Sequence, residues 1–103
     1  MDKTTAVKCV KQYAELVKRH FNVEKIILFG SYSKDVAHKD SDIDVAVVLN
    51  HVDDDFLATE AKLFRLRRDI DVRIEPVLLE GTNDRSGFLE EILKTGEVIY
   101  STH

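Results

Sequence analysis

Two aspartates, Asp42 and Asp44, stand two residues apart at the start of the run DIDVAVVL. Residues two apart in a β-strand point to the same side, so both carboxylates would lie on one face. Like charges held this close repel each other unless a cation lies between them, and hard carboxylate oxygens suit Mg²⁺. The alternative is a solvated entrance to the strand, although aspartate is poorly suited to a strand that continues as VAVVL. The pair alone leaves both interpretations open.

Gly30 and Ser31 end the preceding apolar run, KIILF. A glycine lets the chain turn there, and a short helix starting at Ser31 would offer unpaired backbone N–H groups to an anion. The hydroxyl of Ser31 would add one more donor to a phosphate oxygen. Because Gly-Ser is also a common turn, this pair alone does not decide between a turn and a phosphate site. The chain has no G-x-x-x-x-G-K-[ST] pattern, so a P-loop is excluded.

A two-metal site needs a third carboxylate from another element. The segment DIDVRIEPVLL offers Asp71 and Glu75 on a shared strand face, with Arg73 between them. Pro76 cannot donate to a β-ladder, so we expect this strand at an edge of the sheet or bulged there. A plain exposed edge would show the same pattern, and the residues alone do not choose between Asp71 and Glu75.

Hydrophobic periodicity predicts the elements that would position these residues. Their order indicates an α/β or α+β domain with two layers and a small sheet. Basic residues lie at the end of the middle helix: Arg65, Arg67 and Arg68. One interpretation is that they steer phosphates toward the cleft; the one we favour is a solvated helix end, where basic residues suit the helix dipole. We expect a helix over 5–20 capped by Thr4 or Thr5, strands over 25–29 and 42–49 with one or two helical turns between them, a helix capped by Asp53 or Asp54 and ending near Arg67 and Arg68, a third strand over 69–79, a helix capped by Ser86 and ending at Gly96, and a strand over 98–100.

Length and composition limit the class of protein. A chain of 103 residues fits one domain, and its formal charge of −4, with both signs interspersed, argues against an extended nucleic-acid surface. Cys9 is the only cysteine, so no intrachain disulfide can form, and a cytoplasmic location is the natural expectation. We expect no membrane association, because neither a signal peptide nor a run of membrane-spanning length is visible.

Taken together, these motifs resemble the nucleotidyltransferase superfamily of DNA polymerase beta, and most closely its minimal nucleotidyltransferases. Those proteins carry a G-S-x-A-R-G motif followed by S-D-I-D-L. Here the corresponding residues are Gly30-Ser31-Tyr32-Ser33-Lys34-Asp35 and Ser41-Asp42-Ile43-Asp44-Val45. The resemblance covers essentially the whole chain. It implies a polymerase beta-like fold, a small mixed sheet flanked by helices, in a single minimal nucleotidyltransferase domain over residues 1–103.

The resemblance also implies roles for individual residues. The nucleotide would be bound by Gly30, Ser31, Lys34 and Ser41. Asp42 and Asp44 would be catalytic ligands of two Mg²⁺ ions, with Glu75 as the third acid, because the run 76–79 then matches the apolar strand that follows this acid in the family. Asp71 is the fallback. Lys34 replaces the family's arginine and Asp35 its glycine; both changes favour weaker nucleotide binding, and neither removes a metal ligand.

The implied reaction moves a nucleoside monophosphate, AMP from ATP or another nucleoside triphosphate, onto an acceptor hydroxyl. Minimal nucleotidyltransferases often pair with a small helical HEPN protein and can act as antitoxins by modifying it. The resemblance therefore implies a HEPN-type partner in a hetero-oligomer, with a homo-oligomer as another option. The alternative is a catalytically weak or inactive antitoxin that neutralises its partner by contact.

Overall fold

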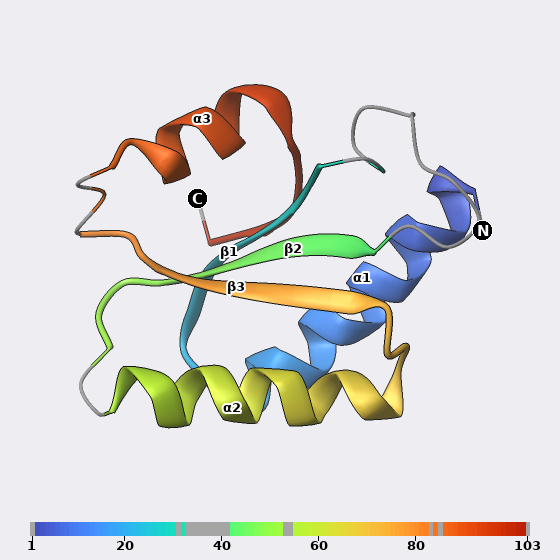
Figure 1. Cartoon of the computed structure of the whole chain (residues 1–103), viewed down its shortest axis with the longest axis horizontal. Coiled ribbons are helices and arrows are strands. Elements are labelled where there is room, and N and C mark those ends of the chain that lie inside the picture. The colour runs from blue at the N-terminus through green and yellow to red at the C-terminus, as the bar shows by residue number, and fades with distance from the viewer. Residues whose placement is uncertain are drawn as a thin grey trace.

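The computed structural model of the chain describes residues 2–30, 32, 42–52, 55–82, 84 and 86–102. Four strands form one mixed sheet in the order β3-β2-β1-β4, in which β2 is parallel to β3 and β1 is antiparallel to both of its neighbours. The fold class expected from the sequence, a small mixed sheet flanked by helices, is confirmed. Along the chain the elements are α1 (Lys3–Lys18), β1 (Val23–Phe29), β2 (Ile43–Leu49), α2 (Phe56–Leu66), the 3₁₀ turn η1 (Arg67–Asp69), β3 (Ile74–Glu80), α3 (Phe88–Thr95) and β4 (Glu97–Ser101) (Figure 1).

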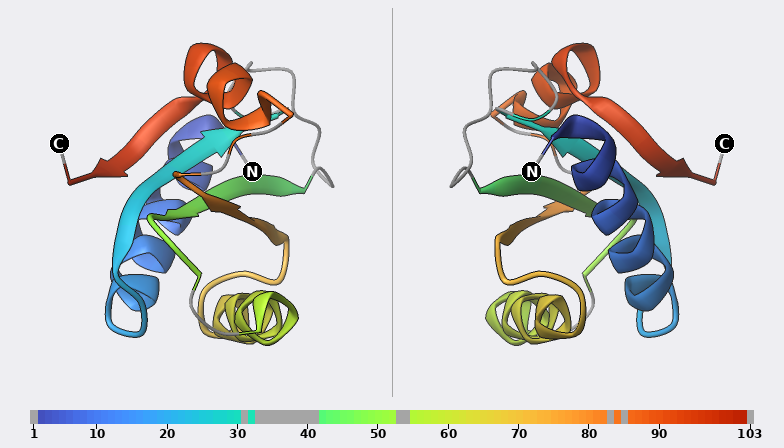
Figure 2. Two further views of the ribbon diagram at one scale, coloured as in Figure 1. Left: turned by 90° about the vertical axis from the view of Figure 1, so that its left-hand side faces the viewer. Right: turned by 90° about the vertical axis from the view of Figure 1, so that its right-hand side faces the viewer.

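Helices cover the two faces of the sheet unequally. Figure 2 shows α3 on the opposite side of the sheet from α1 and α2. The larger core cluster joins buried residues of α1 and α2 to alternate residues of β2, among them Ile43, Val45 and Val47. The smaller cluster lies under α3 and contains Ala46 and Val48, which alternate with Val45 and Val47 along β2. Both faces of β2 are therefore covered, as its nearly continuous apolar sequence predicts.

Helix α1 begins earlier than the sequence suggests. Oδ1 of Asp2 accepts a hydrogen bond of 2.8 Å from the backbone N–H of Thr5, so Asp2 is the N-cap. The predicted caps, Thr4 and Thr5, lie inside the helix, and the expected range of 5–20 is wrong by two residues at each end. A carboxylate at the N-cap also suits the positive end of the helix dipole, which explains why Asp2 takes this position.

Carboxylates also begin the other two helices. Asp55 caps α2 by accepting 2.9 Å from the N–H of Leu57, whereas the predicted caps, Asp53 and Asp54, lie outside the described residues. At α3, Asp84 accepts hydrogen bonds from the N–H groups of two helical residues, at 2.9 and 3.0 Å. The predicted cap, Ser86, accepts only from Phe88 at 3.3 Å, and the N-cap residue itself is Gly87. The predicted C-cap of α3, Gly96, is confirmed.

The third strand is shorter than predicted, since it begins at Ile74 and not at residue 69. The residues before it form η1 and a turn, in which the N–H groups of Ile70 and Asp71 both bond to the carbonyl oxygen of Arg67 at 3.0 and 2.8 Å. These local bonds satisfy backbone groups that an extended strand would have to pair with a neighbouring strand. The strand does lie at an edge of the sheet, as Pro76 predicts.

A buried hydroxyl ties α1 to α2 and gives a test of the packing. Oη of Tyr13, which is fully buried, donates a hydrogen bond of 2.8 Å to the carbonyl oxygen of Leu63. Tyr13→Phe should lower the free energy of unfolding by about 1 kcal/mol, because that carbonyl loses a buried donor. Urea denaturation measures the change. Tyr100→Phe is the matched control: it keeps the ring that Lys18 covers at 4.2 Å, so its effect should stay within about 0.5 kcal/mol.

Candidate active site

Asp44 and Glu75 are neighbours on adjacent strands. They are register partners in the parallel pairing of β2 with β3. Side chains of such partners point to the same face of a sheet from strands about 4.8 Å apart. Asp44 alternates with Ile43 and Val45, which face α1 and α2, so both carboxylates lie on the α3 side. The strand pairing alone therefore brings these two predicted site residues together at the end where β2 begins.

Gly30 lies directly beside Asp44, because its neighbour Phe29 is the register partner of Asp44 in the pairing of β1 with β2. Its φ of +74° lies in the left-handed region that favours glycine. A Cβ atom at this position would collide with Oδ2 of Asp44 and would lie 3.1 Å from its Cγ. The missing side chain thus leaves the space in which the carboxylate of Asp44 sits.

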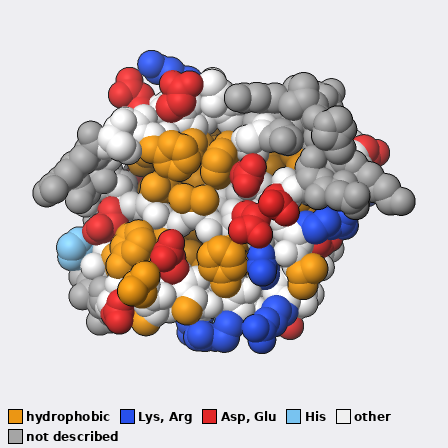
Figure 3. All heavy atoms as spheres, viewed as in Figure 1, with side chains coloured by type: hydrophobic (Ala, Val, Ile, Leu, Met, Phe, Trp, Pro, Cys, Tyr) orange, Lys and Arg blue, Asp and Glu red, His pale blue; other side chains and the backbone are white. Residues whose placement is uncertain are grey.

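Asp42 precedes β2, is exposed to solvent, and acts electrostatically on Asp44. Burial raises the pKa of Asp44, and the negative charges of Asp42 and then Glu75 raise it further. Asp44 is therefore close enough to each of the other two carboxylates to be repelled by it. On the face of the molecule drawn in Figure 3, acidic side chains gather beside a hydrophobic patch. A cation bound among them would relieve this repulsion.

The three acids, Asp42, Asp44 and Glu75, have the donor chemistry of a metal site. Their oxygen donors are of the hard type that Mg²⁺ prefers, and the space above Gly30 gives the Asp44 carboxylate room beside the backbone. Among the described residues, no three His, Cys, Asp or Glu side chains are already arranged around one point as a metal ion requires. The chemistry of the donors fits a divalent cation, and binding one requires the carboxylates to converge further.

Glu75 has a partner that the sequence did not reveal. Nη1 of Arg67, at the end of α2, donates 3.2 Å to Oε1 of Glu75 and 2.9 Å to the carbonyl oxygen of Ile74. The expectation that Arg67 lies in solvent is wrong, because its side chain is only 25% exposed. No periodicity signals this pair, whose members are separated by a turn. Arg65 and Arg68 are exposed, as expected.

Asp71, the fallback for the third acid, is engaged elsewhere. Its Oδ2 accepts 2.9 Å from Nη2 of Arg73, and its Oδ1 accepts from both Nε and the backbone N–H of Arg73 at 3.1 and 2.8 Å. These bonds hold the pKa of Asp71 below its ordinary value. The structure therefore places Glu75, and not Asp71, beside Asp44.

Three predicted nucleotide-binding residues, Ser31, Lys34 and Ser41, lie outside the described residues, as does the short helix expected between β1 and β2. The fourth, Gly30, is the one that the structure places beside Asp44. Tyr32, next to Ser31 in the sequence, is buried in the core of the α1 face. Within the described ranges, no helix is long and apolar enough to cross a membrane.

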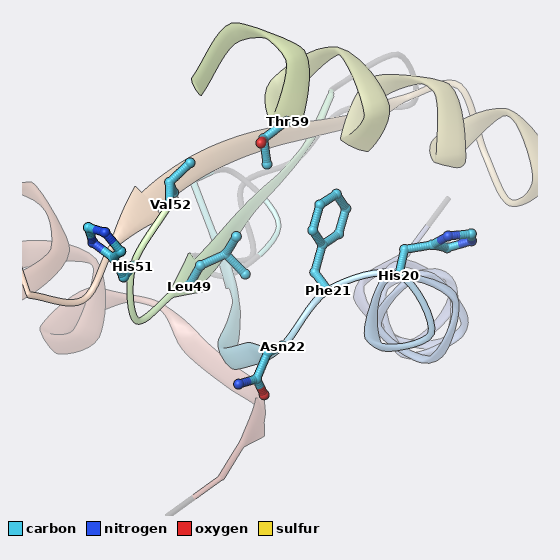
Figure 4. Close-up of a pocket in the computed structure, with 7 residues that line it drawn as sticks. All are labelled: His20, Phe21, Asn22, Leu49, His51, Val52 and Thr59. Atoms are coloured by element: carbon cyan, nitrogen blue, oxygen red, sulfur yellow. The ribbon is translucent and has the colours of Figure 1, made fainter. Parts of the chain in front are cut away.

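A hollow of about 220 Å³ lies away from the acids. Its lining includes Leu49, at the end of β2 opposite to Asp44, so the hollow is separate from the acidic group. Figure 4 shows His20 and His51 at opposite sides of it, without converging on a common point. His51 instead lies 3.4 Å from a carboxylate oxygen of Glu80. The full lining is His20, Phe21, Asn22, Leu49, His51, Val52 and Thr59.

Residues 11–103 match the family model described as Polymerase beta, Nucleotidyltransferase. A proposed nucleotidyltransferase from Sulfolobus solfataricus is 19% identical, with a TM-score of 0.72 over 97% of this chain and 84% of that one. A toxin–antitoxin structure with AMP-PNP is 22% identical, with a TM-score of 0.69 over 90% of this chain and 74% of that one. A mutant of the toxin–antitoxin MntA–HpeT is 18% identical, with a TM-score of 0.59 over 100% of this chain and 76% of that one. No curated protein matches the chain.

The space above Gly30 gives a second testable prediction. Gly30→Ala should destabilise the fold by about 1 kcal/mol because alanine is strained in the left-handed conformation. It should destabilise the fold by about 1 kcal/mol more because the new Cβ atom forces the Asp44 side chain to move. Gly87→Ala is the matched control, since Gly87 has the same φ of +74° and open space around it. Denaturant unfolding of both variants measures the difference. In an Asp44→Ala background this difference should vanish, and its persistence would mean that Asp44 is not the obstacle.

The raised pKa of Asp44 gives a third. The carboxyl of Asp44 binds its proton more tightly in the folded than in the unfolded protein. The protein therefore loses stability as pH rises from the ordinary pKa of this carboxyl, 3.8, through its higher pKa in the folded state. Asp44→Asn should therefore stabilise the protein at neutral pH, by at most about 1 kcal/mol because solvent screens the half-buried carboxylate. The gain should disappear near pH 3, at about one unit below the ordinary value. Urea denaturation at both pH values tests this, with Asp69→Asn, an exposed aspartate of η1, as the control.

Proposed function

Because the chain belongs to the polymerase beta nucleotidyltransferase family, we propose that it moves a nucleoside monophosphate from a nucleoside triphosphate to an acceptor hydroxyl. Members of this family use nucleoside triphosphates and a divalent metal ion. The observation that carries the proposal for this chain is the pairing of Asp44 with Glu75, beside Gly30 and near Asp42. We assign the activity to residues 1–103 as one minimal domain.

The carboxylates have one task in this proposal. Asp42, Asp44 and Glu75 hold two Mg²⁺ ions, which when bound activate the acceptor hydroxyl and neutralise the leaving pyrophosphate. The protein contributes position and charge: β2 fixes Asp44, β3 fixes Glu75, and Asp42 lies just before β2. The raised pKa of Asp44, caused by burial and by the other two acids, supports this assignment, because a bound cation would offset that cost.

The nucleotide is held at the end of β1. We assign Gly30, Ser31, Lys34 and Ser41 to the triphosphate, with backbone N–H groups and the Lys34 ammonium as the donors. The left-handed turn at Gly30 lies directly beside Asp44, which supports a phosphate position next to the metal ligands. ATP is the proposed substrate, so AMP is the group moved; one similar structure was determined with AMP-PNP, which supports an adenine nucleotide.

The acceptor is proposed to lie on a partner protein of the HEPN type, which the transfer would inactivate. In the step, the acceptor oxygen forms a bond to the α-phosphorus while the bond to pyrophosphate breaks. Two similar structures are toxin–antitoxin proteins, which supports an antitoxin role for this chain in a hetero-oligomer. The cytoplasm is the proposed compartment, which rests on Cys9 as a lone free cysteine.

The function is tested by measuring the transfer of label from labelled ATP to the HEPN-type partner in the presence of Mg²⁺. Asp44→Asn and Glu75→Gln should each lower the transfer rate at least about a hundred-fold, since loss of outer-sphere partners alone costs 10–100-fold. Asp71→Asn should retain transfer, because Arg73 occupies that carboxylate. If Asp71→Asn loses transfer and Glu75→Gln keeps it, the third acid is misassigned.

The same variants separate catalysis from contact. If the wild-type protein transfers no label but neutralises the partner, and Asp44→Asn neutralises it equally well, the chain is an antitoxin that acts by contact. That outcome would overturn the enzymatic proposal.

A further inference from the structure

Arg67 reaches the acidic group from the end of α2 around the edge strand β3. Its Nη1 donates to Oε1 of Glu75 at 3.2 Å and to the carbonyl oxygen of Ile74 at 2.9 Å. We propose that Arg67 is a positioning residue that holds the carboxylate of Glu75 beside Asp44 for a divalent cation. This inference rests on the proposed function, in which Glu75 is the third metal ligand.

Glu75 needs such a restraint more than the other acids do. Its side chain is 40% exposed and it faces the negative charge of its register partner Asp44. A glutamate side chain has three rotatable bonds, so this repulsion would otherwise turn the carboxylate into solvent. The positive charge of Arg67 offsets the repulsion and fixes one oxygen of the carboxylate.

Arg67 is itself held in place. Its guanidinium carbon lies 4.9 Å from the centre of the Phe64 ring, a cation–π distance, and its Nη1 also binds the backbone of β3. An arginine fixed by an aromatic face and a carbonyl oxygen loses little further freedom when it binds a carboxylate. The pair therefore differs from an exposed ion pair, in which two free side chains contribute little.

The bonding pattern leaves one oxygen of Glu75 for a cation. Arg67 binds Oε1, and within the described part of the chain Oε2 accepts no hydrogen bond. Arg67 and a metal ion can thus bind the same carboxylate through different oxygens. This arrangement matches the outer-sphere partners that orient metal-binding carboxylates in other proteins.

Calorimetric titration of the full chain with Mn²⁺ tests the inference. Arg67→Met should raise the Kd about ten-fold, the lower end of what outer-sphere partners contribute. Arg68→Met, a change of the next residue, which is exposed, should leave the Kd unchanged. In a Glu75→Gln background, Arg67→Met should have no further effect, because the group that it positions is gone.

Each outcome decides between distinct conclusions. If Arg67→Met has the wild-type Kd or a lower one, Arg67 only competes with the cation and the inference is overturned. If Arg67→Met raises the Kd equally in the wild-type and Glu75→Gln backgrounds, Arg67 does not act through Glu75 and is a structural residue, which also overturns the inference. Arg67→Lys keeps the charge without the planar group and should give an intermediate Kd, so it decides the question if Arg67→Met does not fold. If the wild-type chain binds no Mn²⁺, the proposed function fails and the inference falls with it.

Discussion

The parallel pairing of β2 with β3 is the constraint on which the whole acidic group depends. It makes Asp44 and Glu75 register partners, although more than 20 residues of chain lie between them. Parallel neighbours need a crossover connection, and α2 with η1 supplies it here. Because the crossover returns the chain to the end where β2 begins, it delivers Arg67 to the same place. One connection therefore sets both the proposed third ligand and the arginine that binds it.

The two faces of the sheet have different roles in holding the acidic group in place. Ile43 and Val45, on either side of Asp44, are fully buried in the larger cluster with α1 and α2. Their burial fixes the strand and so holds Asp44 in a position that electrostatic repulsion opposes. The α3 face, where the acids lie, has a smaller hydrophobic core, so part of this face is free of apolar packing and holds charged groups. Asp44 is a local cost that the opposite face offsets, a pattern typical of functional sites.

Local patterns in this sequence predict its elements well, whereas contacts between residues distant in the sequence leave no pattern in it. The apolar run after Asp42 and Asp44 predicts a strand over 42–49, which the structure confirms from Ile43 onward, so that Asp42 lies just before it. Pro76 predicts an edge strand or a bulge, and the edge position is confirmed. The predicted start of the third strand is too early, because the alternation of Ile70 and Val72 with charged residues also fits a turn. Val72 is 64% exposed, so it does not belong to a buried strand face. Arg67 was missed because its partner comes from the next element, and only tertiary packing brings the two together.

Two arginine–carboxylate pairs near the start of β3 show why residue type alone could not choose the third acid. Arg73 binds Asp71 within one turn and occupies both of its oxygens, so that carboxylate has no oxygen left without a donor. Arg67 binds Glu75 through a single oxygen. The carbonyl oxygen of Arg73 accepts 2.8 Å from the N–H of Ile43, which fixes the register of β3 against β2 two residues before Glu75. That bond sets Glu75 opposite Asp44 and leaves Asp71 in the turn, so geometry separates two acids that the sequence places on the same face.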